Sequence, residues 1–229
     1  MKIAIIPARG GSTRIKNKNI KLFHKKPIIY YSIMAAIKSR IFDKVFVSTD
    51  CLKTIKIAKK YGAEILKRPR HLCYNHVGLA EVVQYHLKKL LNTYKNISHG
   101  CCLFATAPLI SKLDLKKGFK ILKNHTSCFP VCEYDAPIQQ AFKKIKNSVL
   151  PINSKLNVEQ SQKLEKFYYD TGTFYLFNIQ KFLKKKSFFS RDNVTFVLPK
   201  ERVQDINTIT DFNLAKIKYI FQKKLNEKK

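Results

Sequence analysis

A short apolar strand that runs straight into a cation-rich glycine loop most constrains what this chain can fold into. Residues 3–7 (IAIIP) lead into Ala8-Arg9-Gly10-Gly11-Ser12, and no Asp or Glu precedes Asp43. Residues 9–26 contain seven Arg or Lys side chains. Backbone N–H groups and fixed cations at the end of a buried strand are suited to binding a polyphosphate.

The glycine spacing excludes the two commonest phosphate-binding loops. Neither G-x-x-x-x-G-K-[ST] nor G-x-G-x-x-G occurs in the sequence. This argues against P-loop NTPases and dinucleotide-dependent dehydrogenases. Nucleotidyltransferases, which hold a nucleoside triphosphate with a different kind of loop, remain as the favoured class.

Length and charge bound the remaining possibilities. The chain has 229 residues and is 45% hydrophobic, which predicts a single domain over residues 1–229 with one sizeable core. Its 45 Lys and Arg against 15 Asp and Glu give a net charge of +30, which would attract any anionic partner. Only seven of these cations are Arg, so we interpret most of the charge as solvated lysine and expect no nucleic-acid binding.

The cysteines and the apolar runs indicate a cytoplasmic protein without membrane contact. No C-x-x-C pair occurs, which favours free thiols in a reducing compartment. The apolar start is too short for a signal peptide, and no run reaches the length of a membrane span. The six cysteines are Cys51, Cys73, Cys101, Cys102, Cys128 and Cys132.

Short apolar strands alternate with helical patterns over the first 132 residues. Strands are expected at 3–7, 44–49, 63–66, 101–105 and 127–132, and helices at 27–38, 52–61, 78–91 and 113–123. This alternation predicts an α/β fold of the Rossmann type, with a mostly parallel sheet and helices on both faces. Ligands of such sheets bind beyond the carboxyl ends of the strands. The polar residues expected there are the loop from Ala8, Asp50, Arg68, Thr106 and Asp205.

The rhythm breaks between residues 134 and 166. This segment is polar and contains Pro137 and Pro151, so we expect an excursion from the sheet that serves as a lid or a dimer arm. Strands return at 167–177 and 194–198, and a final helix is expected from 208 to about 225. Thr208 and Asp211 have the spacing of a capping box at its start.

Asp205 and Asn207 form a second chemical signal just before that helix. Residues two apart in an extended segment point the same way, so the pair offers a carboxylate and an amide oxygen to one point. Mg²⁺ prefers oxygen ligands, and in nucleotide sites one or two carboxylates plus phosphates suffice. Local hydrogen bonding by a loop Asp and Asn is the alternative.

Several motifs, in their order along the chain, resemble those of the cytidylyltransferases that activate nonulosonic acids. That family includes the sialic acid synthetases. The motifs are AIIPARGGS, VSTD ending at Asp50, Lys67-Arg68-Pro69, ATAPL at 105–109, and QDINT at 204–208. Cys101-Cys102, Glu133-Tyr134-Asp135 and the segment from Tyr168 to Tyr175 resemble the pseudaminic acid branch more closely. The resemblance implies a nucleotidyltransferase fold, a homodimer, Mg²⁺, CTP and a nine-carbon acidic sugar as substrates, and a CMP-sugar and pyrophosphate as products.

The resemblance also implies roles for individual residues. Catalytic roles fall on Arg9, Lys18 and Asp205, and the metal would be held by Asp205 and Asn207. The residues implied in CTP binding are Ala8, Arg9, Gly10, Ser12, Lys18, Asn19 and Arg68. Those implied around the sugar are Thr106, Gln139, Tyr169 and Phe174, although the strand pattern by itself favours Phe174 as a core residue.

Two departures from the family pattern fall at metal and phosphate positions. Thr13 replaces the lysine that usually follows Arg-Gly-Gly-Ser, with Arg14 and Lys16 as candidate substitutes, and Asn207 replaces the second aspartate of Asp-x-Asp. Two alternatives to a nonulosonate cytidylyltransferase therefore stay open. One is a related sugar nucleotidyltransferase, such as a ketodeoxyoctonate activator. The other is a catalytically weakened homologue that acts as a basic binding protein.

Overall fold

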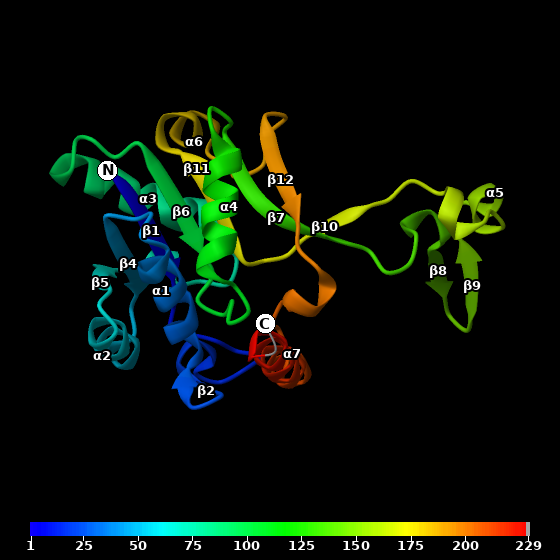
Figure 1. The fold of residues 1–229 in the computed structure, drawn as a ribbon, viewed down its shortest axis with the longest axis horizontal. Helices are drawn as coiled ribbons and strands as arrows, with labels where there is room; N and C mark the ends of the chain where they lie inside the picture. The colour runs from blue at the N-terminus through cyan, green and yellow to red at the C-terminus, as the bar shows by residue number, and fades with distance from the viewer. Residues whose placement is uncertain (228–229) are drawn as a thin grey trace.

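The computed structural model describes residues 1–227 and has an eight-stranded sheet at its centre (Figure 1). The strand order is β10-β7-β11-β6-β1-β4-β5, and β12 pairs with the outer side of β7. The last two positions of the predicted domain, 228 and 229, lie outside the described residues. The strands are β1 (Lys2–Pro7), β4 (Lys44–Thr49), β5 (Glu64–Lys67), β6 (His99–Leu103), β7 (Ser127–Glu133), β10 (Tyr168–Asp170), β11 (Phe174–Asn178) and β12 (Asn193–Val197).

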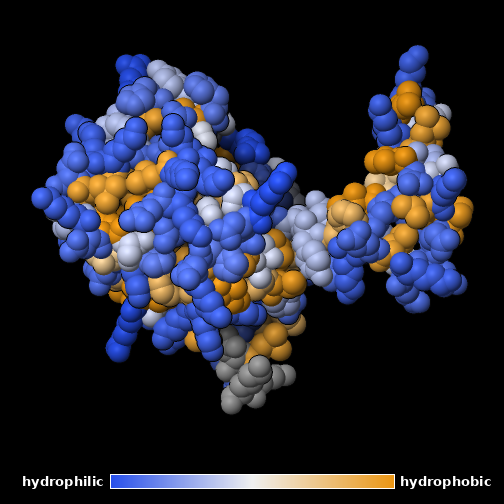
Figure 2. Space-filling view, turned by 90° about the horizontal axis from the view of Figure 1, so that it is seen from above, coloured by the Kyte–Doolittle hydropathy of each residue, from blue (hydrophilic) through white to orange (hydrophobic). Residues whose placement is uncertain are grey.

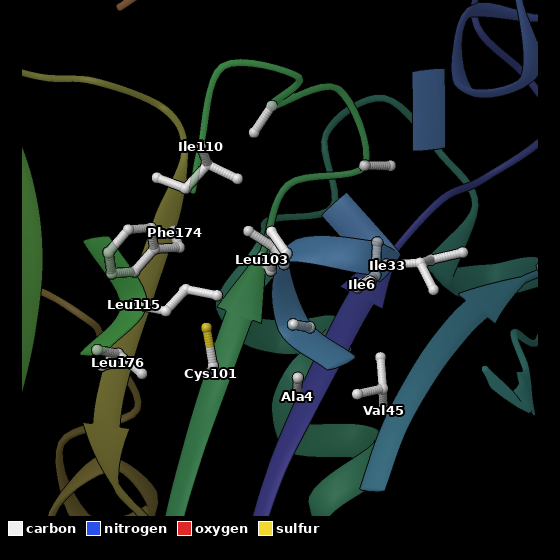
Figure 3. Close-up of a cluster of buried hydrophobic side chains, with 14 of the residues drawn as sticks. Ala4, Ile6, Ile33, Val45, Cys101, Leu103, Ile110, Leu115, Phe174 and Leu176 are labelled. Atoms are coloured by element: carbon white, nitrogen blue, oxygen red, sulfur yellow. The ribbon is translucent and has the colours of Figure 1, made fainter. Parts of the chain in front are cut away.

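Strand β1 is buried on both faces, which explains its uninterrupted apolar sequence. Ala4 and Ile6 belong to one core cluster, whereas Ile3 and Ile5 belong to the other, as the period of two along a strand requires. Figure 3 shows Ala4 and Ile6 packed among side chains of neighbouring elements in the first cluster. The centre of the sheet therefore supports the loop that follows β1 from two sides.

Helices cover both faces of the sheet, as predicted. α1 (Ile28–Ser39), α2 (Leu52–Lys60) and α4 (Lys112–Leu122) contribute buried residues to the cluster of Ala4 and Ile6. α3 (Leu79–Thr93) and α6 (Ile179–Lys185) contribute to the opposite cluster. The final helix, α7 (Ile209–Glu227), packs through Phe212 against Phe23 in a third, smaller cluster. Within residues 1–227, every helix is too short or too polar to cross a lipid bilayer.

The sheet is parallel through β6, β1, β4 and β5 and mixed beyond β6. β11 runs antiparallel to both β6 and β7, while β12 runs parallel to β7. The single strand expected at 167–177 is wrong, because the chain breaks there into β10 and β11. Gly172 lies in the break with a φ of +59°, a left-handed conformation that glycine adopts without a Cβ clash. The Asp170 carboxylate accepts a hydrogen bond from the N–H of Gly172 at 3.1 Å.

Residues 134–167 leave the sheet between β7 and β10 and form an arm that projects from the body (Figure 1). The arm contains an antiparallel hairpin of β8 (Phe142–Ile145) and β9 (Ser148–Pro151), followed by the short helix α5 (Ser154–Asn157). Apolar side chains are exposed over its surface, as Figure 2 shows. They include Phe142, Ile145, Val149, Leu150, Ile152 and Val158.

Two further hairpin strands were not expected from the sequence pattern. β2 (Leu22–Phe23) and β3 (Lys26–Pro27) pair just after the glycine loop. Each has only two residues, which is too short for any periodicity to register. All six cysteines are free, and four of them are buried in the core.

Candidate active site

A cavity of about 470 Å³ opens beyond the carboxyl ends of β1 and β6. Its walls come from the loop after β1, the segment after β6, the stretch from Asn75 to Leu79, and Asn207. Four cations line it and, among the described residues, no carboxylate does. The volume is typical of small-molecule sites, and the charge suits an anionic ligand. The four cations are Arg9, Arg14, Lys18 and Arg68.

Hydrogen bonds to neighbouring elements hold the glycine loop from several directions. The N–H of Ala8 donates to Ser48 O at 2.8 Å, and Asn19 Nδ2 donates to Arg9 O at 2.9 Å. The N–H of Gly10 donates to Asp50 Oδ1 at 2.7 Å. Ala8 is buried and Gly10 is turned toward Asp50, so neither residue is among those that line the cavity.

The side chain of Arg9 is held as well as its backbone. Its Nη1 donates to Cys73 O at 2.8 Å, which ties the glycine loop to the opposite wall of the cavity. Ser12 and Asn19, both expected around the nucleotide, also line the cavity. Asn19 is 9% exposed, and its amide is used to fix the loop. The structure therefore brings four of the seven residues implied in nucleotide binding to one cavity wall: Arg9, Ser12, Lys18 and Asn19.

Arg68 reaches the cavity from the end of β5. It is 5% exposed, and its Nε donates to Leu72 O at 2.8 Å. Burial lowers the pKa of Arg68, yet a guanidinium keeps its proton at any physiological pH. No ion pair satisfies this side chain within residues 1–227. A buried cation of this kind is stabilised by an anion that enters the cavity.

Lys18 joins the glycine loop to the segment that carries Asp205. Its Nζ donates to Ile206 O at 2.7 Å. Burial lowers the pKa of Lys18, and the nearby Asp205 carboxylate opposes that shift. The ammonium therefore lies between the cation-rich loop and the predicted metal pair.

Asp205 and Asn207 lie side by side, with Asn207 Nδ2 donating to Asp205 Oδ2. Asn207 lines the cavity. No cluster of three or more His, Cys, Asp or Glu side chains occurs in the part of the chain that the structure describes. One carboxylate and one amide fit a Mg²⁺ ion that takes its remaining oxygens from phosphates and water, and they do not form a closed protein cage.

The four residues implied around the sugar do not lie together within a single copy of the protein. Thr106 lines the cavity beside Phe104 and Ala105. Phe174 is fully buried and packs against Phe196 in the core, so its ring does not reach the cavity. The buried position of Phe174 agrees with the strand pattern and not with the sugar contact that the family resemblance implies.

Gln139 and Tyr169 belong to the arm and its root. Gln139 Nε2 donates to Glu165 O at 2.9 Å inside the arm. The ring of Tyr169 packs edge-on against Tyr134, with 5.0 Å between the ring centroids. Burial, followed by a hydrogen bond with Cys132, raises the pKa of Tyr169. Neither side chain lines the cavity of its own chain.

Of the two candidate substitutes for the missing lysine, Arg14 lines the cavity beside Thr13 and Lys16 does not. Several other residues that line the cavity were not expected there from the sequence. Phe104 follows β6 directly, so the carboxyl-end rule that selected Thr106 could have found it. Val77 and Leu79 lie in a loop and at a helix start and carried no signal.

Comparisons with known proteins show the family and the fold of the chain. The profile of the cytidylyltransferase family matches residues 3–228. The chain is 40% identical to the pseudaminic acid cytidylyltransferase of Campylobacter jejuni over 95% of each chain. It is 30% identical to the N-acylneuraminate cytidylyltransferase of Escherichia coli, over 99% of this chain and 53% of that protein. A solved structure of CMP:2-keto-3-deoxy-manno-octonic acid synthetase complexed with CTP superposes with a TM-score of 0.69 at 16% identity, over 97% of this chain and 99% of the other.

Proposed function

The chain belongs to the cytidylyltransferase family, and on that premise we propose that it transfers CMP from CTP to pseudaminic acid, with release of pyrophosphate. The enzyme is a CTP-utilising nucleotidyltransferase that makes a CMP-nonulosonate. The observation that carries the proposal is the cation-lined cavity beyond β1. Five of the seven residues that the family pattern assigns to the nucleotide line it, namely Arg9, Ser12, Lys18, Asn19 and Arg68.

In this reaction the anomeric hydroxyl of the sugar gives up its proton and attacks the α-phosphorus of CTP. A bond forms between the anomeric oxygen and that phosphorus, and the bond to the β,γ-pyrophosphate breaks. Negative charge grows on the leaving pyrophosphate. The protein accelerates such a transfer chiefly by holding the groups in line and stabilising this charge.

We assign that electrostatic work to Arg9, Lys18 and Arg68, which line the cavity. Arg9 and Lys18 are already oriented by the carbonyls of Cys73 and Ile206. Because these contacts exist before substrate binds, the cations lose little side-chain entropy when the triphosphate arrives. Thr106, after β6, is proposed to contact the sugar on the far side of the cavity.

Asp205 and Asn207 would hold Mg²⁺ against the triphosphate. When bound, this ion supplies positive charge to the phosphate oxygens. The hydrogen bond from Lys18 to Ile206 O, between the two ligands in sequence, fixes the segment that presents them. One carboxylate gives a weaker site than two, so the nucleotide itself is an essential part of this site.

We further propose a homodimer, with the arm as its interface. The apolar side chains exposed over residues 142–158 support it. Gln139 and Tyr169 keep their proposed sugar contacts only where the arm of one protomer reaches the cavity of its partner. The free cysteines support a cytoplasmic location.

The test is pyrophosphate release by the purified chain with paired substrates. We expect turnover with CTP and pseudaminic acid, and little with other nucleoside triphosphates or with ketodeoxyoctonate. Preference for ketodeoxyoctonate would replace the proposed acceptor. No turnover with any pair, together with a salt-sensitive gel shift on DNA or RNA, would support a basic binding protein instead.

A further inference from the structure

Asp50 lies directly after β4 and binds the glycine loop from behind. Its Oδ1 accepts the hydrogen bond from Gly10 N–H at 2.7 Å. Asp50 is not among the residues that line the cation-rich cavity. The contact is close on this side: a Cβ added to Gly10 would lie 3.0 Å from Cys51 Cβ and 3.6 Å from Asp50 Oδ1. The loop is therefore pressed against Asp50 and Cys51.

The hydrogen bond between Gly10 and Asp50 determines which backbone N–H groups of the loop remain available to a ligand. Gly10 N–H is taken by Asp50, and Ser12 N–H donates to Gly10 O at 2.9 Å. Gly11 and Thr13 donate their N–H groups to no acceptor within the described residues. Thr13 also lines the cavity. Backbone N–H groups that are fixed and unpaired form the usual recognition element for a phosphate.

Asp50 also lies close enough to Cys73 to act on its thiol. Burial, and after it the negative charge of Asp50, raises the pKa of the Cys73 thiol. The carbonyl of the same Cys73 accepts the hydrogen bond from Arg9 Nη1 at 2.8 Å. One carboxylate thus contacts the glycine loop at Gly10 and lies beside the residue that orients the guanidinium of Arg9.

We propose that Asp50 is a positioning residue for the triphosphate of CTP, which fixes Gly10 from behind and leaves the N–H of Thr13, at the cavity wall, to bind phosphate. The inference rests on the proposed function for the identity of the nucleotide. It distinguishes Asp50 from the proposed metal ligands, because Asp50 Oδ1 accepts the N–H of Gly10, whereas Asp205 lies next to Asn207 on the segment that Lys18 contacts at Ile206.

The chain contains a matched control at the other end of β1. Asp43 Oδ2 accepts a hydrogen bond from Lys2 N–H at 2.6 Å. Both acids are exposed, and each accepts one backbone N–H next to β1. Only Asp50 lies at the cavity end, so Asp43→Ala removes an equivalent hydrogen bond far from the nucleotide.

The experiment measures CTP affinity by calorimetry without sugar, and then KM, kcat and the melting temperature. We expect Asp50→Ala to weaken CTP binding and raise the KM for CTP about tenfold, the loss expected for one charge-assisted contact, with a smaller change in kcat. Asp50→Asn, which keeps an acceptor oxygen, restores most of the affinity. Asp43→Ala lowers the melting temperature by a similar amount to Asp50→Ala and leaves CTP affinity unchanged.

Three outcomes would overturn the proposal. Equal effects of Asp50→Ala and Asp43→Ala on CTP affinity would mean a purely structural role. Unchanged CTP affinity in Asp50→Ala would remove the role altogether. A raised Mg²⁺ requirement at saturating CTP would make Asp50 a metal ligand.

A second variant and a comparison of CTP binding with turnover complete the test. If Asp50→Ala does not fold, Gly10→Ala tests the same contact, because its added methyl group must push the loop away from Cys51 and is expected to weaken CTP binding. A wild-type chain that binds CTP but does not turn over pseudaminic acid would refute the proposed acceptor and leave this test intact.

Discussion

Lys18 and Arg9 are two cavity cations whose positions are fixed by backbone carbonyls of distant segments. Each donates a hydrogen bond of 2.7–2.8 Å to a backbone carbonyl across the cavity, at Ile206 and Cys73. We expect Lys18→Ala and Arg9→Ala each to weaken CTP binding by about 1.5–3 kcal/mol, because each loses a charge-assisted contact. Titration calorimetry with CTP measures this. Wild-type affinity in both variants would mean that the triphosphate lies elsewhere.

The metal pair supports a prediction with two parts. Asp205→Ala is expected to abolish turnover, since the pair then has no carboxylate. Asn207→Asp adds a charge, worth on the order of 1 kcal/mol or a few at partly solvated separations, and is expected to lower the Mg²⁺ concentration that gives half-maximal activity. The measurement is a Mg²⁺ titration of pyrophosphate release at saturating substrates.

Each part has its own refuting result. Wild-type turnover in Asp205→Ala would end the metal assignment. An Asn207→Asp enzyme that requires more Mg²⁺ would show that the asparagine is adapted to this site, in which its amide donates to Asp205.

The acid-free, cation-rich stretch that the sequence shows after β1 forms one wall of the cavity, with Arg9, Arg14 and Lys18. Its role in binding an anion stays a prediction. The sequence did not predict that Gly10 turns its N–H to Asp50 or that Asn19 binds the loop backbone. The contact of Gly10 with Asp50 depends on the parallel register of β1 and β4, which places Pro7 opposite Ser48.

Among the elements, the start of α7 has a pH-dependent cap. Asp211 Oδ2 accepts the N–H of Thr208 at 2.7 Å, and Asp211 N–H donates back to Thr208 Oγ1 at 3.2 Å. The hydrogen bond from Thr208 N–H lowers the pKa of Asp211 in the folded state. Its stabilisation is therefore complete above the unfolded-state pKa of about 3.9 and is lost as the pH falls through the folded-state pKa.

We expect Asp211→Ala to lower the free energy of unfolding by about 1 kcal/mol at pH 7. The difference from wild type should shrink as the pH falls below about 4, where the carboxyl is protonated. Urea denaturation over a pH series measures it. Asp211→Asn serves as the control, because it keeps an acceptor and removes the titration. A difference that is independent of pH would show that the charge of Asp211 does not contribute.

Most of the elements follow from periodicity, and the failures have local causes. Long elements with buried apolar faces, such as β1 and α3, were predicted within two residues at each end. The segment 167–177 reads as one strand because its aromatic residues continue across Gly172. The break arises from the left-handed backbone at Gly172 and from Thr171 Oγ1, which donates to Pro130 O at 3.0 Å. A pattern of hydrophobic residues predicts neither the backbone conformation of Gly172 nor this hydrogen bond of Thr171.

For the whole molecule, the arm supports a prediction about assembly. Deleting residues 147–158 removes β9 and α5 together with exposed Val149, Leu150 and Val158. Since no described residue covers these side chains, we expect the wild type to be a dimer and the deletion variant a monomer on light scattering. A full-length chain that is monomeric at micromolar concentration would refute this interface.

The sheet should not depend on the arm for its own folding. β7 and β10 pair with each other where the arm begins and ends, through Glu133 and Tyr168. The deletion variant is therefore expected to keep a cooperative unfolding transition. Loss of that transition would make the monomer a consequence of misfolding, and a polar substitution such as Val149→Ser would then replace the deletion.

The way the arm is rooted also bears on how such proteins diversify. Because the arm leaves and re-enters the sheet at one pair of adjacent strands (Figure 1), its two ends lie next to each other and it forms a self-contained insertion. Mutations in it can drift, or a relative's arm can be grafted in, without redesign of the sheet that holds the nucleotide. A lineage could thereby change which copies of itself associate while inheriting its phosphate chemistry intact.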